Sequence, residues 1–176
     1  MPHRSWFQAL AVAALVSGAA GSAHAADQAH ATMMNADGES VGAVTLTQTP
    51  NGVLIQAELA RLPAGWHAFH IHETGKCEPP FKSAGGHFAP AGHAHGIRSE
   101  DGMHAGDLPN VFVPESGELK FDASAKQVTL AEGEANSLFD DDGSAIMMHS
   151  GADDYQTDPA GDAGDRIACG VIESGS

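Results

Sequence analysis

Short apolar segments separated by turn residues recur along most of the chain, and no window shows the sustained 3.6-residue period of an amphipathic helix. Segments of this length between turn residues are typical of β-strands. They span residues 41–47, 53–59, 66–72, 110–114, 118–122, 127–130, 145–149 and 167–172. The pattern predicts an all-β domain, an antiparallel sandwich or barrel of about eight strands that opens near Ala29.

Turn signals support the same interpretation. The dipeptides Asp37-Gly38 and Asn51-Gly52 lie between apolar segments, and both favour tight hairpins because they tolerate left-handed backbone. Two longer segments do not fit strands: residues 73–108 are rich in Gly, His and Pro, and residues 150–166 are rich in Gly and Asp. Loops this long in a compact domain are usually functional or disordered. The chemistry-bearing side chains of the first loop indicate function.

The beginning of the chain has the pattern of an export signal. Arg4 precedes an apolar run over residues 6–16, and a segment of small residues ends in Ala23-His24-Ala25. This order predicts a Sec-type signal peptide over residues 1–25, removed to leave a single domain over residues 26–176. The run is shorter than the ~20 residues of a membrane span, so we expect no membrane anchor after cleavage. Export would place Cys77 and Cys169 in an oxidising compartment, where they can pair.

The net charge of the chain limits the kinds of molecule that it is expected to bind. The chain has 8 Lys and Arg against 23 Asp and Glu, a formal net charge of −15. A surface this acidic is repelled by phosphate backbones and anionic lipids, so we expect no nucleic-acid or membrane-surface binding. With 42% hydrophobic and 18% charged residues the composition is that of a globular domain. The unusual count is 11 histidines, which outnumber the Lys and Arg together.

Strand periodicity orients some of these histidines. Residues two apart on a strand share a face, so His70 and His72 should point the same way while Phe69 and Ile71 enter the core. His67 has the parity of the core residues and is expected to be a structural, hydrogen-bonded histidine. Seven histidines lie between positions 67 and 104, and an eighth ends an apolar segment: His67, His70, His72, His87, His93, His95, His104 and His149.

Residue types in this set indicate bound metal. His95, His104 and Asp107 offer nitrogen and oxygen ligands of the kind that suit Zn²⁺ in a site of three histidines and one aspartate. A second set offers nitrogen alone, which suits Cu²⁺, and consists of His70, His72, His87 and His149. The spacing indicates a bound metal, and it does not by itself distinguish one metal from another. His93 could replace His95 as a zinc ligand, and His30 could bind stray metal.

The sequence around these residues resembles the copper–zinc superoxide dismutases, with features of the bacterial periplasmic branch. Residues 65–73, GWHAFHIHE, are similar to the family's G-x-H-x-F-H-x-H-E segment, and residues 85–88, GGHF, to its bridging-histidine loop. His95-Gly96 and residues 104–108, HAGDL, match the zinc subloop at the expected offsets. Met148-His149, Asp153 and residues 164–172, GDRIACGVI, complete a resemblance that covers nearly all of the chain after residue 25.

The resemblance implies an eight-stranded Greek-key barrel or sandwich with two functional loops, one copper and one zinc ion per subunit, and dismutation of superoxide by alternating reduction and oxidation of copper. The implied copper ligands are His70, His72, His87 and His149, and the implied zinc ligands are His87, His95, His104 and Asp107. His87 would bridge both metals, Asp153 would link a copper ligand to a zinc ligand, and Arg166 would dock the substrate anion. The implied disulfide joins Cys77 to Cys169.

The sequence also contains further candidate residues and is compatible with other functions. Ala89 stands where many family members have a polar residue, and Lys76, Lys82 and Arg98 are candidates for guiding superoxide. A dismutase-like module that only binds periplasmic copper is the main alternative function. A zinc hydrolase fits less well because four ligands already fill the zinc set. Alternation along strands cannot separate a monomer from a homodimer.

Overall fold

The structure, a computed structural model, describes residues 27–175. It contains the strands β1(Gln28–Asn35), β2(Ser40–Thr49), β3(Gly52–Leu59), β4(Gly65–His67), β5(Phe69–His72), β6(Val111–Val113), β7(Leu119–Ala125), β8(Ala145–His149), β9(Arg166–Val171) and β10(Glu173–Ser174), with one short 3-10 segment, η1(Lys82–Ala84). No helix in this part of the chain is long and apolar enough to cross a membrane. The predicted signal peptide, residues 1–25, lies outside the described residues.

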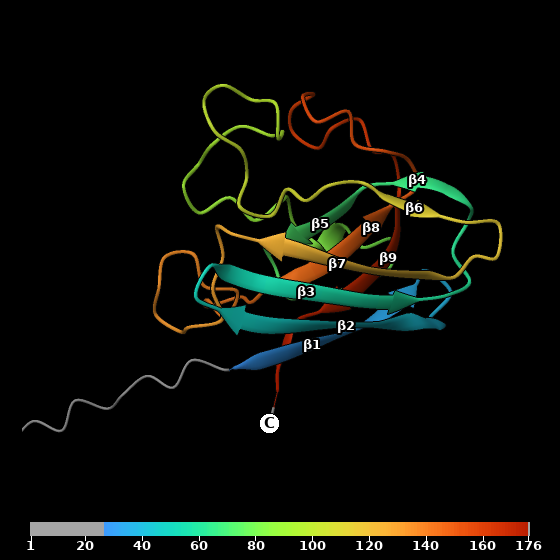
Figure 1. Cartoon of the computed structure of the whole chain (residues 1–176), viewed down its shortest axis with the longest axis horizontal. Coiled ribbons are helices and arrows are strands. Elements are labelled where there is room, and N and C mark those ends of the chain that lie inside the picture. Colours follow the sequence, from blue (N-terminus) through green and yellow to red (C-terminus); the bar gives the residue numbers. More distant parts are fainter. Residues whose placement is uncertain (1–26, 176) are drawn as a thin grey trace, which may run out of the picture.

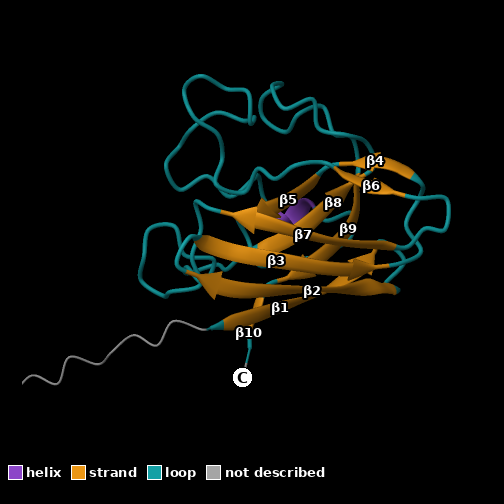
Figure 2. Cartoon of the chain, in the orientation of Figure 1, coloured by secondary structure: helices purple, strands orange, loops and turns teal. Residues whose placement is uncertain are grey.

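Most strands form one curled antiparallel sheet (Figures 1 and 2). Its order is β5-β8-β9-β1-β2-β3-β7, with β10 paired to β1, and β4 and β6 pair separately. Because β9 returns across the sheet to lie beside β1, the topology has the long connection of a Greek key. The all-β antiparallel fold class is therefore confirmed.

The hydrophobic core follows from strand alternation. On β1 the inward residues Ala29, Ala31 and Met33 have no exposed surface, while the residues between them face outward. β3 repeats the pattern with buried side chains at every second position from Val53. Since successive side chains of a strand point to opposite faces, an apolar residue at every second position is enough to cover one face of the sheet.

Both predicted hairpin turns are present. Asp37-Gly38 connects β1 to β2, and Asn51-Gly52 connects β2 to β3, with Thr49 opposite Gly52. Gly38 and Gly52 have φ of +78° and +106°. A Cβ atom on Gly52 would collide with the carbonyl of Ala125, so this turn needs glycine both for its backbone angle and for the close approach of β7.

Two expected strands are wrong in detail. The segment 66–72 breaks at Ala68, which bonds to the carbonyl of Gly151 and to the amide of His149, so β4 and β5 belong to different sheets. Residues 127–130 form no regular strand: a turn ends at Gln127, and Thr129 makes one isolated bridge to Ser137. Their apolar side chains are buried as expected, but the amide of Leu130 donates to the Gln48 side chain at 2.7 Å instead of to a neighbouring strand.

The two long loops lie at one end of the sheet. Figure 1 shows the yellow-green loop that follows β5 and the red loop that follows β8 side by side above β5 and β8. A disulfide joins Cys77, in the first loop, to Cys169 on β9, with their Cα atoms 5.6 Å apart and 92 residues of sequence between them. The expected disulfide is present, and it ties the first loop to the sheet.

Reduction of this disulfide should loosen the loop before it unfolds the sheet. On the loop-closure model a bridge across 92 residues stabilises the fold by about 4–5 kcal/mol. We expect limited proteolysis between residues 73 and 86 to accelerate in reductant, at a temperature where far-UV circular dichroism is unchanged. Cleavage that begins only when the strand signal is lost would contradict this, and the double variant C77S/C169S serves as a control for the reductant.

Candidate metal centre

Strand β5 presents two histidines to the region under the loops. All four residues of β5 are buried; Phe69 and Ile71 belong to the main apolar cluster, and His70 and His72 lie on the opposite face. The predicted parity is therefore confirmed. Both imidazoles have no exposed surface, because the two loops cover the face that the strand pattern alone would leave open to solvent.

A local irregularity places two further residues beside them. The register of β8 and β9 shifts between Met148 and His149, so that His149 lies directly opposite Arg166 and Ile167 is the extra residue. Bulges of this kind often lie next to active sites, where they change the direction in which a side chain points. Since β8 pairs with β5, residues separated by almost eighty positions in sequence meet at the same end of the sheet.

The first cluster consists of imidazoles only. Their ligand nitrogens lie within 4.8 Å of one another and belong to His70, His72, His87 and His149. One nitrogen of each ring, Nδ1 of His70 and Nε2 of the other three, is buried without a hydrogen-bond partner in the part of the chain described. Buried polar atoms are nearly always paired, so four converging exceptions fit a bound cation, and an all-nitrogen set fits copper.

The outer nitrogens of the same rings are held by the protein. His70 Nε2 lies 2.8 Å from a carboxylate oxygen of Asp153, His72 Nδ1 lies 3.1 Å from the carbonyl of Gly85, and His149 Nδ1 lies 3.4 Å from the carbonyl of Gly164. Such partners fix the orientation and the tautomer of a metal-binding imidazole. Each inner nitrogen is thereby left with its lone pair toward the cluster.

The second cluster adds an oxygen ligand. It consists of His87, His95, His104 and Asp107, again within 4.8 Å. The Nδ1 atoms of the three rings lie 2.8, 3.0 and 3.3 Å from Oδ1 of Asp107. Ligand atoms around a tetrahedral Zn²⁺ at ~2.0 Å stand about 3.3 Å apart, so the set matches zinc in type and spacing. The amides of Gly96 and His104 donate to Oδ2, which turns Oδ1 toward the cluster.

Backbone pairing fixes these segments against β5. Ile71 donates to the carbonyl of Gly106, Gly106 to that of Phe88, and Phe88 to that of Ile71, in three bonds of 2.9 Å. A Cβ atom on Gly106 would collide with the carbonyl of Ile71, so glycine is needed where the three segments meet. His87 and Asp107, the neighbours of Phe88 and Gly106, are positioned by this closed ring of bonds.

His87 belongs to both clusters. Its Nδ1 faces Asp107 at 2.8 Å, and its Nε2 is the unpartnered nitrogen that faces the first cluster. The ring centroids of His70 and His95, one from each cluster, lie 4.0 and 5.0 Å from that of His87. One imidazole can therefore serve two cations, one through each nitrogen.

Asp153 forms a second connection between the clusters. Its Oδ2 accepts from His70 Nε2 at 2.8 Å, and its Oδ1 lies 3.0 Å from Nε2 of His95. The side chain of Asn110 holds the backbone of Asp153 from both sides: its Nδ2 donates to the Asp153 carbonyl, and its Oδ1 accepts from the Asp153 amide, each at 2.8 Å. Sequence reasoning did not identify Asn110, and only its place three residues after Asp107 could have drawn attention to it.

Charge and burial prepare the site for cations at neutral pH. Burial lowers the pKa of His72 to about 2, of His149 to about 3 and of His87 to about 4, although the hydrogen bond from His87 to Asp107 partly opposes the last shift. Burial alone would raise the pKa of Asp107, but hydrogen bonds from His104 and His87 hold it well below its usual range. These imidazoles are thus neutral ligands beside an ionised carboxylate.

The remaining candidate residues lie elsewhere. His67 is buried with Nδ1 2.8 Å from the carbonyl of His149 and Nε2 2.9 Å from that of Pro63, as expected of a structural histidine. His93 and His30 are exposed and belong to neither cluster. Lys82 lines a cleft of about 610 Å³ together with Arg166, whereas Lys76 and Arg98 do not line it.

Comparison with known proteins agrees with this geometry. The family described as copper/zinc superoxide dismutase (SODC) matches residues 40–172. Superoxide dismutase [Cu-Zn] 2 of Aquifex aeolicus is 50% identical over 147 residues, which cover 82% of this chain and 86% of that protein.

Two solved structures share the fold. A SOD-like protein from Bacillus subtilis has a TM-score of 0.77 and 39% identity, covering 81% of this chain and 96% of its own. The Cu/Zn superoxide dismutase from Brucella abortus has a TM-score of 0.67 and 29% identity, covering 83% and 99%.

Loss of the Asn110 side chain should lower the zinc affinity of the second cluster without unfolding the sheet. Asn110→Ala removes both bonds to the Asp153 backbone, and removal of groups that orient metal ligands typically lowers metal affinity by about 10–100-fold. Competition with a zinc chelator measures the change. Asn136→Ala is the matched control, because that amide bonds to a backbone carbonyl outside the site. Equal zinc affinity in the two variants would show that Asn110 does not position Asp153.

Proposed function

Since the chain belongs to the copper/zinc superoxide dismutase family, we propose that its two histidine clusters are the copper and zinc sites at which it carries out that family's reaction. The reaction is the dismutation of superoxide to dioxygen and hydrogen peroxide, and the cofactors are copper and zinc. The proposed copper ligands are His70, His72, His87 and His149, and the proposed zinc ligands are His87, His95, His104 and Asp107.

The position of His87 is the observation that carries this proposal. A domain that only buffers copper needs one cluster, and a zinc hydrolase needs a zinc site with an open position for water. Here a second cluster supplies four ligand atoms of its own and shares one ring with the first. The two adjacent sites have different ligand types and share one imidazole. This arrangement supports a redox-active copper site whose shared ligand is fixed by a structural zinc site.

When bound, copper supplies one-electron transfer in both directions, while zinc, which has no redox chemistry, fixes and polarises the shared ring. Two protons, both ultimately from solvent, are consumed for each hydrogen peroxide, and a side chain at the site can deliver one of them. Nε2 of His87 is the proton-carrying atom in this proposal, because its ring stays held at Nδ1 beside Asp107.

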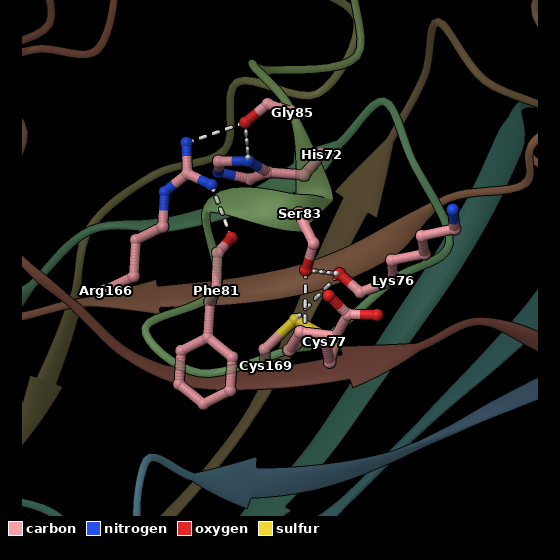
Figure 3. The surroundings of a disulfide bond; sticks show 9 residues. His72, Lys76, Cys77, Phe81, Ser83, Gly85, Arg166 and Cys169 are labelled. Atoms are coloured by element: carbon pink, nitrogen blue, oxygen red, sulfur yellow. Dashed lines mark hydrogen bonds between the residues drawn. A yellow bond between two sulfur atoms is a disulfide. The ribbon is translucent and has the colours of Figure 1, made fainter.

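Arg166 is proposed to dock the substrate anion. Its Nη1 and Nη2 each donate at 2.6 Å, to the carbonyls of Phe81 and Gly85 respectively (Figure 3). A guanidinium has five N–H donors, so three remain for a small anion. Arg166 and Lys82 line the same cleft together with Asp165, so the two cations exceed the one carboxylate there and leave a local positive charge on a protein whose net charge is strongly negative. At physiological salt, distant charges are screened within ~8 Å, so the local charge decides.

Substitution of Arg166 tests the docking role. Arg166→Ala should retain copper and zinc but lower kcat/KM for superoxide by roughly 10–100-fold, the ~1.5–3 kcal/mol of a charge-assisted hydrogen bond. Superoxide decay is followed by pulse radiolysis, with both metals quantified in the same samples. Lys126→Ala is the control, because this exposed cation follows β7 outside the cleft. Unchanged turnover in fully metallated Arg166→Ala would refute docking, and copper-loaded wild type without activity would favour the copper-binding alternative.

We further propose that the protein acts in the periplasm after removal of residues 1–25. Support comes from the arrangement of Arg4, the apolar run over residues 6–16 and the Ala23-His24-Ala25 site. The disulfide between Cys77 and Cys169 is consistent with an oxidising compartment.

A homodimer is proposed through the face that carries Trp66 and Phe112. These side chains are 59% and 52% exposed, their rings lie 5.2 Å apart, and they line a groove of about 540 Å³ beside Phe121. Exposed apolar patches on soluble domains often mark interfaces. Because two copies of so acidic a chain repel one another, association should strengthen as salt screens the charge.

Sedimentation at low and high salt tests the dimer. We expect the weight-average mass of the wild type to rise toward two chains as salt increases, and the double variant W66S/F112S to remain a single chain at both salt concentrations. Ile97→Ser is the control, because Ile97 is also an exposed large apolar residue but does not line the groove. A wild type that stays monomeric at high salt would refute this interface.

A further inference from the structure

Glu73 follows the last histidine of β5, and its carboxylate takes no part in either cluster. It pairs with Gly86 in both directions. The amide of Gly86 donates to Oε1 of Glu73 at 2.8 Å, and the amide of Glu73 donates to the carbonyl of Gly86 at 3.0 Å. This pairing fixes the turn immediately before His87.

The amide of Gly86 belongs to the same planar peptide group as the carbonyl of Gly85. That carbonyl accepts from His72 Nδ1 at 3.1 Å and from Arg166 Nη2 at 2.6 Å, and Figure 3 shows both side chains directed at it. Because the peptide unit is rigid, anything that fixes its N–H also fixes its oxygen. One peptide therefore stands between the Glu73 carboxylate on one side and a proposed copper ligand and the proposed docking cation on the other.

Close packing leaves this peptide little freedom. Gly85 has φ of +71° and ψ of −153°, a conformation open only to glycine. A Cβ atom at Gly85 would lie 2.6 Å from Oε1 of Glu73, so the carboxylate rests directly against the Gly85 backbone. The absence of a side chain at this position is what allows the carboxylate to reach the next amide.

We propose that Glu73 is a positioning residue for both His72 and Arg166, acting through the peptide between Gly85 and Gly86. A carboxylate that accepts from the N–H end fixes the orientation of this peptide. It also polarises the group and makes the Gly85 oxygen a stronger acceptor, since hydrogen bonds in a chain reinforce one another. Without the Glu73 side chain, the Gly86 N–H loses its acceptor, so the Gly85 carbonyl is held less firmly and the hydrogen bonds that orient His72 and Arg166 weaken.

The inference rests on the roles proposed above for His72 and Arg166, so its first test avoids them. Amide hydrogen exchange at Gly86, measured by NMR in the metal-free protein, reports the Glu73 bond directly. Glu73→Ala should speed this exchange roughly tenfold or more, as loss of a hydrogen bond to a charged group predicts. Glu73→Gln, which keeps an acceptor at the same reach, should stay closer to the wild type than Glu73→Ala does.

Glu78→Ala is the matched control, because it removes an exposed carboxylate of the same loop whose side chain makes no hydrogen bond within the described residues. Glu73→Asp keeps the charge but is one methylene too short to reach Gly86, and it replaces Glu73→Ala if the latter does not fold. Exchange at Gly86 that matches the Glu78→Ala control in Glu73→Ala or Glu73→Asp would overturn the proposal.

The second test uses azide, a small monoanion, titrated into the copper- and zinc-loaded protein and followed by its absorption band with copper. If Glu73 positions Arg166, Glu73→Ala should weaken azide binding by about 3- to 10-fold, with Glu73→Gln between it and the wild type and Glu78→Ala unchanged. Faster Gly86 exchange with unaltered azide affinity would refute the link to Arg166. The docking role of Arg166 itself would still be tested separately by Arg166→Ala.

Discussion

The structure depends on one constraint: the imidazole of His87 must present Nδ1 to one cluster and Nε2 to the other, so neither nitrogen is left for an anchoring partner outside the two clusters. The ring is instead held through its backbone neighbours. Phe88 donates to β5 and accepts from Gly106, and Glu73 fixes the Gly85–Gly86 turn on the other side. The apolar parity of β5, which buries Phe69 and Ile71, gives this arrangement a rigid base in the core.

The concentration of imidazoles in a buried region destabilises the folded protein. Unpartnered ring nitrogens remain on His70, His72, His87 and His149, and each such buried group destabilises a fold by about 1–3 kcal/mol. Several contacts between distant segments offset this cost: the disulfide to β9, the two carboxylates, and the carbonyls that hold the outer ring nitrogens. Bound cations complete the pairing of these nitrogens, so metal binding and the stability of the loops are expected to be coupled.

The parts of this arrangement that repeat locally were predictable from the sequence. Strand alternation predicted the sheet and the shared face of His70 and His72. The residue types, together with the resemblance to a known family, predicted the two ligand sets. The break at Ala68 and the loss of a strand after residue 126 were not predictable, because both depend on partners far away in sequence, Gly151 and Gln48. Asn110 and Glu73 were missed for a related reason: each acts on a backbone group, which leaves no pattern of residue types.

The central claim is that His87 joins two metal sites, and replacement of zinc by paramagnetic Co²⁺ beside Cu²⁺ tests it most directly. An imidazole bound through both nitrogens couples the two unpaired-electron systems. The account predicts that the copper EPR signal is strongly attenuated when cobalt occupies the second site and returns when diamagnetic zinc replaces cobalt. A full, unperturbed copper signal in protein shown by elemental analysis to hold one copper and one cobalt per chain would contradict it.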